Sequence, residues 1–172
     1  GVPYRIVGGT KFFDRKEIRD VMAYLSLVAN PADDVSFQRI VNTPKRGIGK
    51  GTIEQMEEAS RALRMPMLEA AETLIADESV RPSARKSIGE FVEMVKAAHA
   101  YEGDLRKVVE RIIDDTRMVE AYEMEDTDEA RSRIENIKEF LSVVTEFAQT
   151  HDDGEDAYFE APTAADAPGQ DA

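Results

Sequence analysis

The 172-residue sequence contains no cysteine and only two histidines, His99 and His151. The absence of cysteine excludes disulfides and thiolate metal sites, and it makes a reducing, cytoplasmic setting the default expectation. Two histidines disfavour a histidine-based metal site. No apolar run approaches the roughly 20 residues that span a bilayer, and no basic-then-apolar leader is visible. We therefore expect neither a metal centre nor a membrane partner.

The two ends of the chain differ from its centre. Residues 3–7 are rich in β-branched and aromatic side chains and stop at Gly8 and Gly9, which predicts one short strand. A lone strand leaves its hydrogen-bonding groups unpaired, so we expect residues 1–13 to form a junction toward a neighbouring domain of a longer protein. Residues 151–172 hold seven acidic residues and no Lys or Arg, which predicts a disordered acidic tail.

Between these ends, apolar residues recur at helical spacing, which predicts an all-α, irregular multi-helix domain over residues 14–150. A first helix is expected to begin with Asp14 and Glu17 as a capping box and to end at Asn30 and Pro31. Asp33 or Asp34 opens a short second helix, and Thr52 with Gln55 can cap a third. Further helices are expected at about 66–76, 83–101, 104–115, 117–124 and 128–150.

The net charge of −13 would by itself argue against nucleic-acid binding, because phosphate contacts need positive surface. The charges are unevenly distributed, however. Residues 1–50 contain nine Lys/Arg and five Asp/Glu, whereas residues 51–172 contain thirteen and thirty. This asymmetry predicts one basic working face on an otherwise acidic body. Acidic residues that only solubilise helices would explain the second part of the chain but not the first.

Catalytic motifs are not recognisable in this sequence. The segment from Gly49 to Thr52 is similar to the end of a phosphate-binding P-loop, but the first glycine of that motif would fall at Pro44. Paired carboxylates are frequent, as expected of a chain with 35 acidic residues, and no Ser or Thr has a histidine in a triad context. We therefore expect this chain on its own to be catalytically inactive and to hold no cofactor.

A basic, glycine-rich turn between two predicted helices stands out. Gly47 and Gly49 let the backbone approach a ligand closely, and consecutive amides that open a helix form a concave array of donors for a phosphate. Ile48 can pack between the two helices and hold the turn rigid. A basic, glycine-rich turn between two helices is typical of a helix-hairpin-helix element, which contacts the DNA backbone and reads few bases. The predicted DNA-binding residues are Thr43, Lys45, Arg46, Gly47, Ile48, Gly49, Lys50 and Thr52. An ordinary interhelical turn, with lysines for solubility, remains an alternative.

Several segments carry a family resemblance. They are residues 4–9 (YRIVGG), 12–20 (FFDRKEIRD), 23–25, 29–34, 39–49 (RIVNTPKRGIG) and 132–140 (SRIENIKEF). These segments resemble the UvrD/PcrA/Rep type of superfamily 1 DNA helicase, densely over residues 4–49 and again over 131–148. Between these two blocks only the helical pattern is similar.

In that family the matching region is an accessory subdomain called 2B, inserted into the second motor domain. The resemblance implies that the full-length protein is an ATP-dependent 3′-to-5′ DNA helicase of repair or replication, with ATP and Mg bound between two motor domains that this sequence lacks. It implies that the turn at Gly47, Ile48 and Gly49 touches duplex or fork DNA, and that the subdomain swings between open and closed states. Expected partners are DNA and the motor domains of the parent chain.

Charged residues on the first and last helices allow two interpretations. Arg15, Lys16, Glu17 and Asp20 are explained by solvated charges with a Lys16–Asp20 pair, or by a junction with the motor domains. Arg133, Glu135 and Asn136 match the family but also suit a plain helix surface. The rival function for the whole chain is a helical protein-interaction adaptor with an acidic face and no role on DNA.

Overall fold

The computed structural model describes residues 10–150, and every regular element in that range is a helix. The all-α class expected from the sequence is therefore confirmed for this part of the chain. The predicted strand at residues 3–7 and the predicted tail at 151–172 lie outside the described residues. In chain order the helices are α1 (Thr10–Phe13), α2 (Lys16–Ala29), α3 (Asp34–Ile40), α4 (Lys50–Leu63), α5 (Met67–Leu74), α6 (Pro82–His99), α7 (Leu105–Thr116), α8 (Met118–Glu125) and α9 (Asp128–Thr150).

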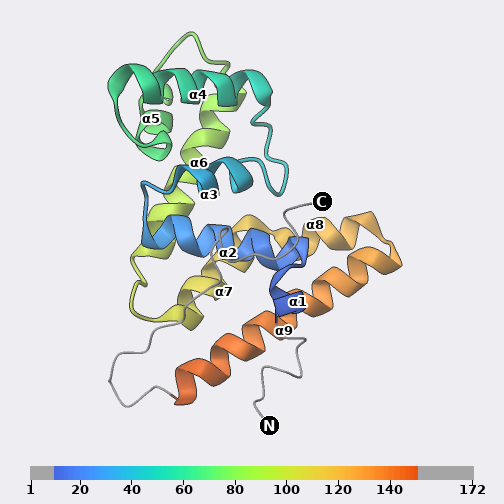
Figure 1. Cartoon of the computed structure of the whole chain (residues 1–172). Coiled ribbons are helices and arrows are strands. Elements are labelled where there is room, and N and C mark those ends of the chain that lie inside the picture. Colours follow the sequence, from blue (N-terminus) through green and yellow to red (C-terminus); the bar gives the residue numbers. More distant parts are fainter. Residues whose placement is uncertain (1–9, 151–172) are drawn as a thin grey trace.

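Helix α2 lies at the centre of the fold, where it contacts α3, α6, α7 and α9 (Figure 1). Helices α4 and α5 pack on each other at one end, and α8 and α9 pack on each other at the other. The long helix α6 connects the two ends because it contacts α5, α2 and α7. The loop between α3 and α4, which holds the basic glycine turn, lies at the α4–α5 end.

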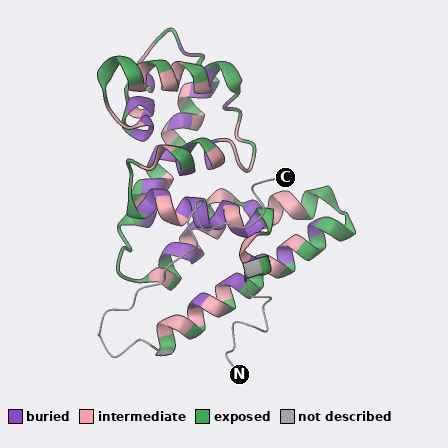
Figure 2. Cartoon of the chain, in the orientation of Figure 1, coloured by how far each residue is buried: buried purple, intermediate pink, exposed green. Residues whose placement is uncertain are grey.

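The central position of α2 explains why its buried surface is wider than one helical stripe. Val21, Met22, Ala23 and Tyr24 are consecutive and all buried, which a helix can achieve only when partners cover several of its faces. Figure 2 shows this helix as the most continuously buried element of the chain. Leu25, which the helical spacing placed in the core stripe, is only partly buried.

The predicted start of the first long helix is wrong. A short helix, α1, precedes it, and the backbone amides of Asp14 and Arg15 bond back to α1 at Lys11 and Phe12, both at 3.3 Å. Asp14 therefore belongs to the link between the two helices. Helix α2 begins at Lys16, with Arg15 at the N-cap position and no side-chain cap. The capping interaction predicted for Asp33 is confirmed, since its carboxylate accepts the Ser36 amide at 3.1 Å.

The start predicted for α4 is also wrong, and this correction affects the candidate site. The N-cap residue is Gly49 rather than Thr52, and no side chain caps the helix. The extended backbone of Gly49, with φ −84° and ψ 179°, allows the helix to begin at once at Lys50. Thr52 lies instead within the first turn of α4, where it is buried.

Candidate nucleic-acid interface

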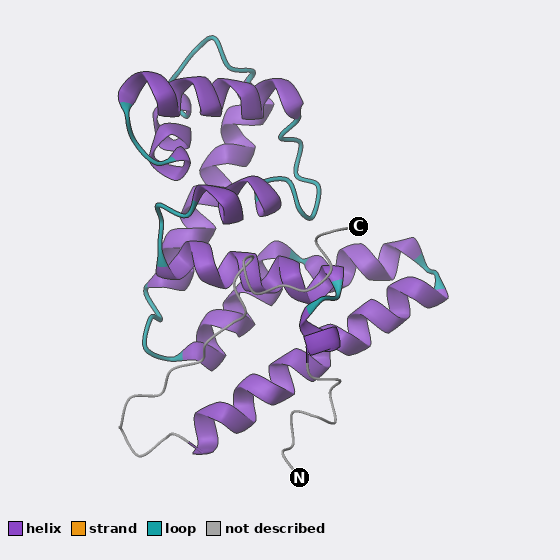
Figure 3. Ribbon diagram, viewed as in Figure 1, coloured by secondary structure: helices purple, strands orange, loops and turns teal. Residues whose placement is uncertain are grey.

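An irregular loop connects α3 to α4 (Figure 3). The side chain of Asn42 closes this loop. Its Oδ1 accepts the backbone amide of Arg46 at 2.9 Å and that of Ile48 at 3.3 Å. Two amides of the predicted phosphate cradle therefore face inward. Among the described residues, the amides that remain for an external ligand include those of Gly47 and Gly49 and those where α4 begins.

Ile48 is fully buried, whereas its neighbours Gly47 and Gly49 are exposed. The packing role predicted for Ile48 is confirmed by this burial. Gly47 has φ +80°, a left-handed conformation that L-residues rarely adopt. A Cβ built on Gly47 would meet Ser87 Oγ at 3.7 Å, which is ordinary contact, so conformation rather than space requires glycine here. Gly49 has neither restriction. Its φ of −84° suits any residue, and a Cβ there would meet nothing within 4 Å.

The N-terminus of α4 has the properties of an anion site. The amides of Lys50, Gly51 and Thr52 precede the first i→i−4 bond of the helix, which joins the Ile53 amide to the Gly49 carbonyl at 3.0 Å. Gly49 supplies no side-chain acceptor for them. The aligned peptide dipoles of this 14-residue helix place partial positive charge at the same end. The side chain of Lys50 is exposed there, and so is that of Lys45 in the preceding loop.

Arg46 lies differently from the surface position that the sequence suggested. Its guanidinium turns inward, where it donates to the Thr43 carbonyl at 3.1 Å and to the Tyr24 hydroxyl. The Arg46 Cζ atom lies 4.7 Å from the centroid of the Phe91 ring. The side chain of Thr43 also bonds within the loop, since its Oγ1 donates to the Arg39 carbonyl at 3.2 Å.

The eight predicted site residues therefore separate into two groups. The outward group is exposed and consists of Lys45, Gly47, Gly49 and Lys50. The inward group is buried or partly buried and consists of Thr43, Arg46, Ile48 and Thr52. The outward group, with the first amides of α4, can meet a phosphate. In the inward group, Thr43 and Arg46 bond within the fold and Ile48 packs in the core.

Sequence reasoning missed two buried carboxylates on α2. Asp20 is 5% exposed and accepts from Lys16 Nζ and from Arg39 Nε, both at 3.0 Å. Glu17 is 4% exposed and accepts from Asn136 on α9. The predicted Lys16–Asp20 pair is confirmed, but the interpretation of Glu17 and Asp20 as solvated charges is wrong. Both segments resemble the helicase family, but no local sequence pattern predicted a contact between Glu17 and Asn136.

Burial and charge shift two pKa values beside these contacts. Burial raises the pKa of the Tyr24 hydroxyl to about 12, although the neighbouring Arg46 guanidinium acts to lower it. Burial alone would lower the pKa of the Lys16 ammonium, but the hydrogen bond and charge of Asp20 outweigh it and raise that pKa. Tyr24 therefore stays protonated, and able to donate, throughout the neutral range.

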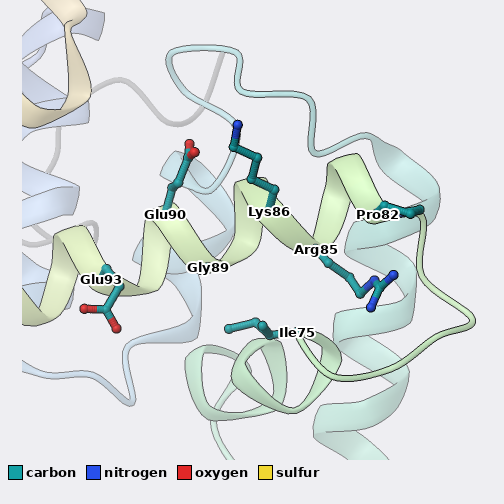
Figure 4. A pocket seen from close by; sticks show the side chains of 7 residues that line it. All are labelled: Ile75, Pro82, Arg85, Lys86, Gly89, Glu90 and Glu93. Atoms are coloured by element: carbon teal, nitrogen blue, oxygen red, sulfur yellow. The ribbon is translucent and has the colours of Figure 1, made fainter.

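A groove of about 510 Å³ lies between α5 and α6 (Figure 4). Its lining mixes the basic Arg85 and Lys86 with the acidic Glu90 and Glu93, and Ile75 contributes an apolar wall. Figure 4 shows Lys86 and Glu90 on one side of α6 and Arg85 on the other. These side chains do not converge on one point, so the groove lacks the grouping of acid, base or nucleophile that catalysis needs.

Comparison with known proteins assigns the chain to a family. The profile of the UvrD-like helicase C-terminal domain matches residues 1–160. The chain belongs to the UvrD-like helicase C-terminal domain family. It is 41% identical over 155 residues to the ATP-dependent DNA helicase PcrA of Bacillus subtilis, covering 89% of this chain and 21% of that protein. It is 34% identical over 154 residues to DNA helicase II of Escherichia coli, covering 88% and 21%. The chain thus spans about a fifth of the length of these curated relatives.

Within residues 10–150, this UvrD-like domain has no group of three or more His, Asp or Glu side chains placed to hold a metal ion. No helix in the same range is both long and apolar enough to cross a membrane. The resemblance to UvrD- and PcrA-type helicases drawn from the sequence is confirmed at the level of the family.

Proposed function

We propose that this UvrD-like domain is the 2B-type accessory subdomain of an ATP-dependent 3′-to-5′ DNA helicase, and that it holds duplex DNA through the turn before α4. The observation that carries the proposal is the uncapped N-terminus of α4, with Lys45 and Lys50 exposed beside it. By the family resemblance, motor domains of the full-length protein would bind ATP and Mg; the Bacillus subtilis relative is named as an ATP-dependent helicase. The chain itself would bind and orient DNA without hydrolysing ATP.

The proposed contact is made to the DNA backbone. A phosphate oxygen would accept from the free amides at the start of α4, while Lys45 and Lys50 supply positive charge around it. Exposed Gly49 has no side chain to stand in front of these amides. Because phosphates carry no direct sequence information, the domain should discriminate little between duplex sequences. Affinity should be weak, since the net charge of −13 repels DNA outside this patch.

Titration of the 15N-labelled 172-residue chain with a short blunt duplex at low salt tests the proposal. We expect the largest shifts in the amides of residues 43–53, and binding that weakens as salt is raised. Lys45→Gln and Lys50→Gln should each lower the slope of log affinity against log salt by about one. Lys138→Gln, at an exposed lysine of α9, is the matched control and should lower it much less.

Absence of shifts in residues 43–53 at low salt would refute the DNA contact. The rival function, an adaptor that uses its acidic surface to bind a basic protein, predicts that outcome. It also predicts that the two lysine substitutions leave partner binding unchanged. Matching the Lys45 and Lys50 variants against Lys138→Gln separates a local phosphate contact from a general effect of charge.

A further inference from the structure

We infer that Arg46 is the positioning residue of the turn rather than one of its phosphate contacts. This inference rests on the proposed function, because it assigns Arg46 a role in presenting the α4 N-terminus to DNA. Within residues 39–50, the exposed cations are Lys45 and Lys50, whereas the Arg46 side chain is partly buried and points into the fold. A basic residue in a DNA-binding turn would ordinarily be counted with the phosphate contacts.

The guanidinium of Arg46 joins three separate parts of the chain. Its Nη2 donates to the Thr43 carbonyl within the loop at 3.1 Å and to the hydroxyl of Tyr24 on α2. The Cζ atom of the guanidinium lies over the ring of Phe91 on α6, 4.7 Å from its centroid. Because α2, α6 and the loop meet at this one group, its removal breaks the contact of the loop with Phe91 and the donation to Tyr24, and leaves the direct Tyr24–Thr43 bond as the remaining link of this cluster.

The Thr43 carbonyl is held from two sides. The Tyr24 hydroxyl donates to it, and the same hydroxyl accepts from Arg46, so the three groups form a closed triangle. Tyr24 is 1% exposed and cannot itself reach a DNA phosphate. A substitution of Tyr24 could therefore change DNA affinity only indirectly, by changing the position of the turn.

The burial of Arg46 also favours a role in positioning the turn over a direct phosphate contact. The Nη1 atom of Arg46 is buried and has no hydrogen-bond partner in the described part of the chain. Burying this charged nitrogen without a partner costs desolvation free energy, and the buried nitrogen cannot contact a ligand in the solvent. Lysine would keep the charge but would lose the broad guanidinium contact with the Phe91 ring and the fixed geometry in which Nη2 donates to two acceptors. Substitution of Arg46 by lysine therefore tests the geometry of the side chain separately from its charge.

The test compares Arg46→Lys and Arg46→Met with the parent 172-residue chain. If Arg46 positions the turn, both variants should weaken binding of a short blunt duplex to a similar degree, about tenfold, the effect of losing one charge-assisted hydrogen bond. Tyr24→Phe should also weaken binding of the duplex. The Tyr24→Phe, Arg46→Met double variant should bind no worse than Arg46→Met alone, because both act through one triangle. Thermal unfolding and the amide signals of α9 verify that each variant is folded.

The inference would be overturned if Arg46→Lys bound duplex like the parent while Arg46→Met bound weakly, because charge alone would then suffice. Hydrogen exchange in the free chain gives a second readout that does not depend on DNA. The Ile48 amide, bonded to Asn42, should exchange roughly tenfold faster in both Arg46 variants. Unchanged exchange would also overturn the inference. A parent chain that fails to bind duplex would refute the proposed function, and the exchange rates would still decide the role of Arg46.

Discussion

The side-chain amide of Asn136 donates a hydrogen bond of 2.7 Å to the carboxylate of Glu17, across 119 positions of sequence. This bond joins α9 to α2, and it also joins the two blocks in which the sequence resembles UvrD-type helicases. The only cation near the same carboxylate in the described part of the chain is Arg133, whose Nε lies 4.0 Å away. Asn136 is therefore the principal partner of a charge that is almost fully buried.

Asn136→Ala should destabilise the fold by about 1–3 kcal/mol, because it leaves a buried carboxylate with an unsatisfied oxygen. The free energy of unfolding can be measured by urea denaturation followed by circular dichroism. Ser142→Ala, at an exposed position on the same helix, is the control and should change stability by less than about 0.5 kcal/mol. Equal urea midpoints for Asn136→Ala and the parent would show that the contact contributes nothing.

The same substitution should have opposite effects at the two exposed glycines of the turn. Gly47→Ser should cost about 1–2 kcal/mol of stability, because its φ of +80° strains any residue with a Cβ. Gly49→Ser should leave stability unchanged or raise it, because serine is a favourable N-cap and the space is open. Gly49→Ser should nevertheless weaken duplex binding, since its hydroxyl would occupy an amide that the phosphate needs.

Urea unfolding together with duplex titration of the two variants checks this pair. If Gly49→Ser loses as much stability as Gly47→Ser, the backbone conformations assigned to the turn are wrong. If it binds duplex like the parent, the phosphate does not lie at the α4 N-terminus. Stability and affinity thus test separate claims about one residue.

Ile48→Ala should lower stability by about 2–5 kcal/mol, because it removes buried methyl groups and leaves a cavity beneath the turn. Val35→Ala is a suitable control, since Val35 is 70% exposed and its truncation should have little effect. Differential scanning calorimetry of both variants gives the comparison. Similar melting temperatures for Ile48→Ala and Val35→Ala would contradict the packing role of Ile48.

Features that depend on near neighbours were predictable from the sequence. Helical periodicity located α2 to α9 to within a few residues, the spacing of Lys16 and Asp20 predicted their pair, and the glycines around Ile48 predicted a tight turn. Features that depend on distant contacts were not. The burial of Glu17 requires Asn136 from the far end of the chain.

The inward turn of Arg46 was missed for the same reason. A basic residue beside glycines in a turn is typical of a phosphate contact, and nothing local distinguishes it from Lys45. Its aromatic partner Phe91 lies on α6, 45 positions away in sequence, and becomes its neighbour only because α6 packs behind the loop. The sequence therefore predicted where the candidate site lies, while the proposed division into contacting and supporting residues required the packed structure.

Stability should fall in alkaline solution through the ionisation of Tyr24. Burial raises the pKa of its hydroxyl to about 12 in the folded chain, above the value of about 10 expected for an unfolded tyrosine. A group that holds its proton more tightly when folded contributes full stability below the unfolded pKa and loses it as pH rises through the folded one. The loss should therefore extend from about pH 10 to about pH 12 and amount to roughly 2–3 kcal/mol. Lysines titrate in the same window, so Tyr24→Phe is the necessary comparison. Urea unfolding of both chains from about pH 8 upward should show the parent losing more stability than Tyr24→Phe, and parallel curves would rule out a contribution from Tyr24.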